Sequence, residues 1–313
     1  MTLQQLRYLH EIASRGLNIS EAAAALYTSQ PGVSKQLRLL EEELGITIFE
    51  RTGKRLSAVT EPGKQVLNIV NRVLDEVLNL KRVGEEYAGE LKGALEIATT
   101  HTQARYLLPP VVKMFMSRYP GVRLRLHQGN PEQVANWVSR GEADIGIATE
   151  ALEDAPLLLT LPCYQWSHMI VAPQGHPALA EGEMTLAKLA QWPLITYDGT
   201  FTGRLRINQA FERAGLVPEI VLTAVDSDVI KTYVELGLGL GIIAEMAFDP
   251  VRDSALVALP SAHLFETNTT RMAIRRGRWL RQFDYAFMEL LTPQFTRQMI
   301  ETTVRGGGED AGL

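Results

Sequence analysis

Residues 20–44, SEAAAALYTSQPGVSKQLRLLEEEL, decide the fold of the first part of the chain. They predict two helices joined by a tight turn at Tyr27, with Ser20 capping the first helix and Ser29 the second. Pro31 fits the first turn of the second helix, where a missing N–H is tolerated. Two short capped helices separated by such a turn are typical of a helix-turn-helix.

The second predicted helix has an apolar face and a polar face. The side chains expected to point inward at helical spacing are Val33, Leu37, Leu40 and Leu44, joined by Ala22, Ala23 and Leu26 of the first helix. The opposite face carries types that reach base edges and phosphates. The contacts expected with DNA are Ser29, Gln30, Pro31, Ser34, Lys35 and Arg38. An ordinary helical hairpin with a solvated polar face is the alternative for this pattern taken alone.

The flanking sequence favours DNA binding. FERTGKRLSAVT at 49–60 predicts a short β-hairpin, a basic wing whose Arg51, Lys54 and Arg55 are expected to contact the DNA backbone. The three glutamates at 41–43 come after the polar face, where the helix is expected to leave the groove. Thr60 and Pro62 then fit the start of a long helix.

In this order, the segments SEAAAAL, TSQPGVSKQLRLLEEELG and IFERTGKRLSAVTEPG, followed by a long helix, resemble the LysR-type transcriptional regulators. Further stretches resemble the CysB branch of that family, which includes Cbl: TTHTQARYLLPPV at 99–111, DIGIATEAL at 144–152, LPCYQW at 161–166 and DVIKTYVELGLGLGIIA at 228–244. The resemblance runs to about residue 303 and leaves out the Gly-rich end, GGGEDAGL.

Composition describes an ordinary globular protein of two or three domains. The chain has 313 residues, of which 46% are hydrophobic, and a net charge of −5. Residues 1–60 hold seven Lys/Arg and six Asp/Glu, so only a small basic face, doubled in a dimer, is available for nucleic acid. The absence of a signal-peptide pattern and of an apolar run of ~18 residues predicts a cytoplasmic protein without a membrane partner.

Several patterns argue against catalysis or a bound metal. The single cysteine, Cys163, excludes an intramolecular disulfide and a Cys-cluster metal site. GLGLG at 237–241 follows a predicted helix and precedes a strand, the reverse of a dinucleotide loop. His101 has no second histidine or carboxylate at metal spacing, which indicates a structural or hydrogen-bonding role. With no nucleophile elbow or paired carboxylates, we expect neither an enzyme nor a cofactor.

The expected fold class is α/β, with an N-terminal winged helix-turn-helix at 1–60, a linker helix and hinge at 61–92, an effector-binding domain at 93–303 and a flexible tail at 304–313. The linker repeats apolar residues every 3.5 positions, which predicts a dimerising coiled-coil seam of Val66, Val70, Val73, Val77 and Leu80. Leu67, Leu74 and Leu78 widen this stripe and are expected to touch the partner's DNA-binding domain. The alternative is an amphipathic helix packed on its own domain, and the hinge is expected at 89–93.

The remaining sequence alternates between short apolar strands and helices, which predicts parallel strands with crossover helices. Strands are expected at 94–99, 122–128, 143–148, 169–172, 194–196, 220–223, 240–244 and 270–275, with helices near 110–118, 133–140, 203–214 and 228–236. Because the last strand returns to the first set, we expect a two-lobed, periplasmic-binding-protein-like domain, with lobe I at about 93–163 and 267–303 and lobe II at about 164–266. The ligand crevice then lies between the lobes, at the carboxyl ends of the strands.

Threonines follow the predicted strands of both lobes. Hydroxyls and backbone N–H groups at a helix start can hold an anion without a charged side chain. The resemblance implies that the site for inducer and sulfate is lined by Thr100, Thr102, Gln103, Thr149 and Thr202. Ser227 joins this effector-binding set because it precedes a helix in lobe II. The alternative for any one threonine is a helix cap; for Tyr164 and Trp166, flanking the site and packing the hinge both stay open.

The resemblance implies a homodimeric or homotetrameric activator that binds double-stranded promoter DNA and works with RNA polymerase. N-acetylserine or O-acetylserine would be the small anionic effector, with sulfate or thiosulfate as competitor, and the regulated genes would serve sulfate assimilation and cysteine biosynthesis. A Cbl-like regulator that senses adenosine phosphosulfate is the close alternative. A two-lobed solute-binding protein or enzyme would explain residues 94–303 but would leave the helix-turn-helix without a role.

Overall fold

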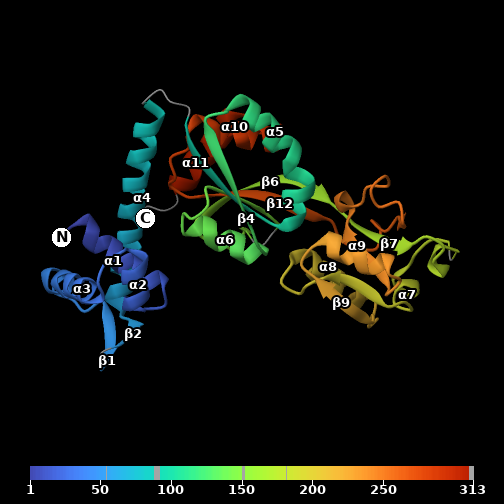
Figure 1. The fold of residues 1–313 in the computed structure, drawn as a ribbon, viewed down its shortest axis with the longest axis horizontal. Helices are drawn as coiled ribbons and strands as arrows, with labels where there is room; N and C mark the ends of the chain where they lie inside the picture. Colours follow the sequence, from blue (N-terminus) through green and yellow to red (C-terminus); the bar gives the residue numbers. More distant parts are fainter. Residues whose placement is uncertain (54, 88–91, 150–151, 181, 310–313) are drawn as a thin grey trace. The chain divides into compact units, whose positions relative to one another are not determined.

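In the computed structural model the chain forms two compact units, Met1–Tyr87 and Ala88–Leu313 (Figure 1). The structure describes residues 1–53, 55–87, 92–149, 152–180 and 182–309, without the side chains of residues 202 and 305–309. No helix within these ranges is long and apolar enough to cross a membrane.

The first unit is the predicted winged helix-turn-helix followed by a long helix. Its elements are α1 (Leu3–Ser14), α2 (Ile19–Ala25), α3 (Gln30–Leu44), the antiparallel hairpin β1 (Phe49–Thr52) and β2 (Arg55–Val59), and α4 (Glu61–Tyr87). Its core is apolar and shared by all three short helices: Leu9, Ile12, Ala22, Val33, Leu37, Leu40 and Phe49 are almost fully buried.

Two local predictions for the helix-turn-helix were wrong. Asn18, not Ser20, caps α2, because its side-chain oxygen accepts hydrogen bonds from the backbone N–H groups of Ser20 at 3.1 Å and Glu21 at 3.2 Å. Leu44 is 38% exposed and is the last residue of α3, which ends at the left-handed Gly45. Ser29 caps α3 as predicted, through the backbone N–H of Gly32.

Most of the predicted seam residues of α4 fall into two groups, one packed in the unit's own core and one exposed. Thr60 caps the helix through Gly63 N–H at 3.0 Å, as predicted. Val70 is buried in the unit's own core, and Val66, Leu67 and Leu74 pack beside it. Leu67 and Leu74 therefore contact their own DNA-binding domain, as the alternative of a helix packed on its own domain predicts, and the expected contact with a partner's domain stays a prediction. Apolar residues of α4 with exposed side chains are Ile69, Val73, Leu78 and Leu80.

The second unit contains two five-stranded sheets, as the two-lobed prediction requires. The first has the order β4-β3-β5-β12-β6, in which β3 is parallel to β4 and β5, and β12 is antiparallel to β5 and β6. Helices α5 and α10 pack on one face and α6 on the other (Figure 1). The bounds are β3 Gly93–Thr99, η1 Gln103–Leu107 (a π-helix), α5 Leu108–Arg118, β4 Val122–Gln128, α6 Pro131–Ser139, β5 Ile145–Ala148, β6 Leu158–Trp166, β12 Asn268–Arg275, α10 Gln282–Leu291 and α11 Arg297–Glu309.

The second sheet has the order β11-β7-β10-β8-β9, with α8 packed on one face and α9 on the other. Strands β8, β9 and β10 are parallel, whereas β7 and β11 are antiparallel to their neighbours. The bounds are β7 His168–Pro173, η3 Pro177–Ala180, α7 Leu186–Leu189, β8 Leu194–Tyr197, α8 Thr202–Arg213, β9 Ile220–Ala224, α9 Ser227–Glu235, β10 Leu240–Ala244, η4 Glu245–Ala247 and β11 Leu256–Leu259.

The differences from the predicted effector domain lie at the connections. Strand β6 stays paired with β12 as far as Trp166, so the first sheet extends beyond the expected end of its lobe at 163. Gly93 is the first residue of β3, and the rest of the expected hinge at 89–91 lies outside the described residues. Helix α11 continues to Glu309, so residues 304–309 of the predicted tail are helical, and Val304 packs against the core of the first lobe.

Candidate functional site

The polar face of α3 is open in the first unit. Gln30, Pro31, Lys35 and Arg38 are exposed and Ser34 is half-buried. Gln30 Nε2 lies 3.3 Å from Ser34 Oγ, so the two side chains restrain each other one helical turn apart. This face therefore presents one long amide and two cations next to the start of a helix, a set suited to base edges and phosphates.

The wing is fastened to α3 by Glu41. Its carboxylate accepts hydrogen bonds from Ile48 N–H at 2.8 Å and Phe49 N–H at 3.3 Å, and Arg51 Nη2 lies 3.4 Å away. Glu41 therefore holds the hairpin, a role that its place after the polar face did not predict. Arg51 is partly neutralised by this pair, whereas Arg55 is exposed, and Lys54 lies outside the described residues.

Threonines from the first lobe meet an aromatic wall from the second at a small cavity of about 30 Å³. The first lobe contributes four predicted residues at the carboxyl ends of β3 and β5, namely Thr100, Thr102, Gln103 and Thr149. The other lining residues are Pro131, Trp166, Tyr197, Phe201, Gly203 and Ala244. No charged side chain is among them, and Thr102 makes no side-chain cap bond at the start of η1, so the helix-cap alternative does not describe it.

Gln103 is 2% exposed, and both ends of its amide make hydrogen bonds within the protein. Its oxygen accepts a hydrogen bond from the Tyr164 hydroxyl, and its nitrogen donates to Thr270 Oγ1 at 3.2 Å. Each of the two alternatives for the aromatic pair therefore holds for one residue: Trp166 lines the cavity, whereas Tyr164 packs behind Gln103 and does not line it.

The predicted residues of the second lobe are placed differently. Ser227 is fully buried and does not line the cavity; its hydroxyl lies 2.7 Å from that of Tyr197, which does. Ala244 N–H also donates to the Tyr197 hydroxyl, at 2.8 Å. Burial raises the pKa of Tyr197, so the phenol is neutral at physiological pH. Thr202 begins α8, but its side chain lies outside the described residues.

Sequence reasoning missed most of the second lobe's contribution. Tyr197 and Ala244 end β8 and β10, so the rule that ligands lie at the carboxyl ends of strands would have found both. Phe201 and Gly203 flank the first residue of α8, where no side chain caps the helix. Unsatisfied backbone N–H groups at such a helix start favour a negative charge.

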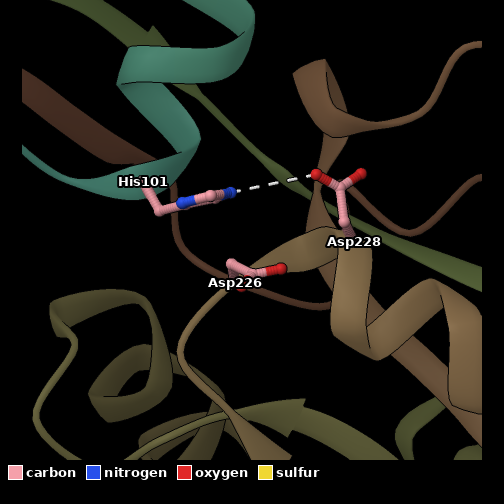
Figure 2. A group of neighbouring side chains, drawn as sticks. All are labelled: His101, Asp226 and Asp228. Carbon is pink, nitrogen blue, oxygen red and sulfur yellow. Dashed lines mark ion pairs between the residues drawn. The ribbon is translucent and has the colours of Figure 1, made fainter. Parts of the chain in front are cut away.

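His101 lies beside this cavity in a charged cluster that the sequence did not reveal. Folding brings Asp226 and Asp228 next to His101 (Figure 2), and one ligand atom from each of the three residues lies within 4.8 Å of the others. His101 Nε2 is 3.9 Å from Asp228, and its Nδ1 is 3.0 Å from Gln128. His101 therefore has two carboxylates near it in space, although none stands at metal spacing beside it in the sequence. The hydrogen-bonding role expected for it agrees with the bond to Gln128.

His168 is buried behind the cavity wall. It is 1% exposed, and within the described residues neither ring nitrogen has a hydrogen-bond partner. Its ring packs edge-on against Trp166 at 5.2 Å and Phe265 at 5.4 Å between centroids. Burial and the charge of Arg206 lower the pKa of His168 to about 3, so the ring is neutral.

Two family models match the chain. One, described as a bacterial regulatory helix-turn-helix protein of the lysR family, covers residues 3–64, and the other, a LysR substrate binding domain, covers residues 88–296. Each model matches within one of the two compact units of the structure.

Close relatives share the whole chain. It is 52% identical over its full length to the HTH-type transcriptional regulator CysB of Burkholderia cenocepacia, and covers 100% of that protein. It is 50% identical, over 97% of its length and 99% of the relative, to the HTH-type transcriptional regulator SsuR of the same species. The solved cofactor-binding domain of the Cbl transcriptional regulator is 46% identical, with a TM-score of 0.66, covering 68% of this chain and 93% of that one.

Proposed function

The chain belongs to the LysR family of bacterial transcriptional regulators, and to its CysB, Cbl and SsuR type, and from this premise we propose that it activates genes of sulfate assimilation and cysteine biosynthesis in response to a small anionic effector. Identity of 50% or more over nearly the entire chain supports this proposal. The observation that carries it is the uncharged cavity of threonines, Gln103 and Tyr197 between the lobes.

Regulators of this family bind DNA, and the open face of α3 is proposed to enter the major groove. Gln30 is the proposed base reader, because an amide can bond adenine at two atoms. Lys35, Arg38 and Arg55 are exposed and are the proposed phosphate contacts, together with Lys54. Arg51 contributes less, since Glu41 already neutralises part of its charge.

The effector is proposed to be an anion held by neutral donors. A cavity without charged lining residues offers hydroxyl and amide hydrogens, and the uncapped start of α8 adds backbone N–H groups. At about 30 Å³ the cavity holds roughly one or two water molecules. N-acetylserine, O-acetylserine, thiosulfate or sulfate would therefore have to move the lobes apart on binding. Such an effector binds the separated arrangement of the lobes more tightly than the closed one, and this difference in affinity is what a switch requires.

Family members also oligomerise, and we extend this to a homotetramer built on α4. The exposed Val73 and Leu80 are apolar side chains without cover in their own unit. Strands β4 and β9, each at an edge of its sheet in the effector domain, carry the exposed Leu126 and Val221. Two kinds of apolar surface, one on each unit, suit an assembly with two kinds of interface.

Two measurements test the proposed function. A gel shift with one sulfur-assimilation promoter fragment should show specific binding, whereas a solute-binding protein of the same fold would show none. Calorimetric titration with N-acetylserine, O-acetylserine, sulfate, thiosulfate and adenosine phosphosulfate should then identify the effector. Binding of adenosine phosphosulfate alone would favour the Cbl-like alternative, and binding of none of the five would contradict the proposed sensor.

A further inference from the structure

One buried hydroxyl joins two walls of the cavity from behind. Thr270, in β12, is fully buried, and its Oγ1 accepts hydrogen bonds from Gln103 Nε2 at 3.2 Å and from Trp166 Nε1 at 3.1 Å. Gln103 belongs to η1 and Trp166 ends β6, so two distant parts of the chain are tied to the same oxygen. Both donors line the cavity, whereas Thr270 does not.

The chemistry of these groups leaves little freedom. An indole N–H can only donate, and it does so to one acceptor at a time. The Gln103 oxygen is occupied by the Tyr164 hydroxyl, so the orientation of its amide is fixed at both ends. Burial raises the pKa of Tyr164, which keeps that hydroxyl a donor. A hydroxyl oxygen at 270 therefore serves as the acceptor for the donors on both sides.

Thr270 also lies where the connecting strands are irregular. Strand β6 leads into the second lobe and β12 returns from it. Their register shifts between Thr270 and Arg271, which pair with Tyr164 and Pro162 respectively and leave Cys163 as the extra residue. Pro162 has no backbone N–H, and an extra residue of this kind disrupts the ladder and lets strands bend.

We infer that Thr270 is a positioning residue that sets Gln103 and Trp166 for the effector and passes a change in their bonds to the strands between the lobes. The inference rests on the proposed function, in which this cavity holds the effector. An effector that draws on the Gln103 amide or displaces Trp166 has to alter the bonds made to Thr270. Because Thr270 lies opposite the extra residue of β6, the strand that leads into the second lobe, the change reaches the connection between the lobes directly.

The test uses the full chain with Thr270→Val, which keeps the shape and removes the acceptor, and Thr270→Ser, which keeps the hydroxyl. Thr196→Val is the matched control, because Thr196 is also fully buried and its hydroxyl donates to a backbone oxygen, Ile242 O, at 3.2 Å. Circular dichroism establishes that each variant folds, and Thr270→Ala replaces the valine variant if that one does not.

We expect Thr270→Val to bind N-acetylserine or sulfate at least tenfold more weakly than the parent and to lose the effect of effector on promoter binding. Promoter affinity without effector should be unchanged. Thr270→Ser and Thr196→Val should stay within about threefold of the parent. Parental affinity and response in Thr270→Val, or an equal loss in Thr270→Ser, would overturn the positioning role.

Tryptophan emission separates this inference from the proposed function. The Trp166 contribution is the difference between each protein and its Trp166→Phe form. In Thr270→Val the indole loses its acceptor, so its emission should shift to shorter wavelength even without effector, and in Thr270→Ser it should not. If the parent binds none of the anions, the proposed sensor fails, and unchanged emission in Thr270→Val would sink the positioning role independently.

Discussion

The Tyr106 hydroxyl, in the first lobe, donates a 2.7 Å hydrogen bond to the carboxylate of Asp228 at the start of α9 in the second lobe. Arg105 Nε lies 2.5 Å and Lys231 Nζ 3.4 Å from the same carboxylate. Burial would raise the pKa of Asp228, but the bond from Tyr106 and the charges of Lys231 and Arg105 outweigh it and lower the pKa. Asp228 is therefore ionised at neutral pH and joins the lobes beside the cavity.

Asp228→Asn should let effector enter faster. The substitution removes the charge that attracts Arg105 across the lobes, so the lobes separate more readily. Stopped-flow Trp fluorescence should show a severalfold higher association rate for sulfate. In the parent the same change should appear only in acid, because the lowered pKa of Asp228 keeps its carboxylate charged until the pH falls below the ordinary range of an aspartate. Asp249→Asn is the control, because the Asp249 carboxylate pairs with Arg252 within its own lobe. Equal association rates in the two variants would contradict the role of Asp228 in holding the lobes together.

His168→Phe should flatten the acid side of the stability profile. The folded pKa of about 3 is far below the value of about 6.5 for an unfolded histidine. Between these values the unfolded chain binds a proton that the native protein does not, so the parent loses stability as pH falls, by roughly 2 kcal/mol at pH 5. Urea unfolding at pH 7 and pH 5 measures this loss, with the exposed His263→Phe as control. A loss of the same size in His168→Phe would show that another group causes it.

Val73→Asp should dissociate the oligomer without unfolding the chain. Val73 is exposed on α4, so a carboxylate there costs the isolated unit little but is expensive inside a seam between two chains. Val70→Asp is the contrast: Val70 is 3% exposed in its own core, and a charge there should unfold the first unit. Sedimentation and thermal unfolding distinguish the two effects. An unchanged oligomer in Val73→Asp would remove α4 from the interface.

Arg38→Ala and Gln30→Ala should weaken DNA binding in different ways. Loss of one phosphate contact lowers the slope of log K against log salt by about 0.9 for each chain and affects all sequences alike. Loss of a base contact costs about 1–3 kcal/mol at the promoter and little on random DNA. Gel shifts at several salt concentrations on both DNAs measure this. Arg15→Ala is the control, because Arg15 pairs with Glu11 on α1, and it should change neither the salt slope nor the promoter affinity. Identical losses for Arg38→Ala and Gln30→Ala on both DNAs would contradict the assignment of one phosphate contact and one base contact.

Thr102→Ala should uncouple effector from DNA response. It deletes one proposed donor to the anion, worth about 1.5–3 kcal/mol, or ten- to hundredfold in affinity. Promoter binding without effector should survive. Thr100→Ala and Thr149→Ala should behave alike, whereas Ser227→Ala should act more weakly because Ser227 reaches the cavity only through Tyr197. Parental affinity of Thr102→Ala for every sulfur metabolite in calorimetry would leave the cavity without a sensing role.

The sequence by itself predicted what depends on neighbours along the chain. Ser29 and Pro31 mark the start of α3, and helical spacing separates its buried face from its polar one. Strand ends are also local features, so four threonine and glutamine positions of the first lobe could be placed at the cavity before the fold was known. The antiparallel β6 and β11 were missed because their pattern resembles connecting segments until their partners are present.

Which side chains from distant segments meet depends on how the whole domain folds. Thr270 and Gln103 are 167 positions apart, and no spacing in the sequence links them. The same holds for His101 with Asp226 and Asp228. An apolar stripe also does not say what covers it, so Leu67 and Leu74 pack on their own unit while Val73 stays exposed. Local propensity fixes a helix or a strand end, but the partner of a hydroxyl or a carboxylate is fixed by packing over the whole domain.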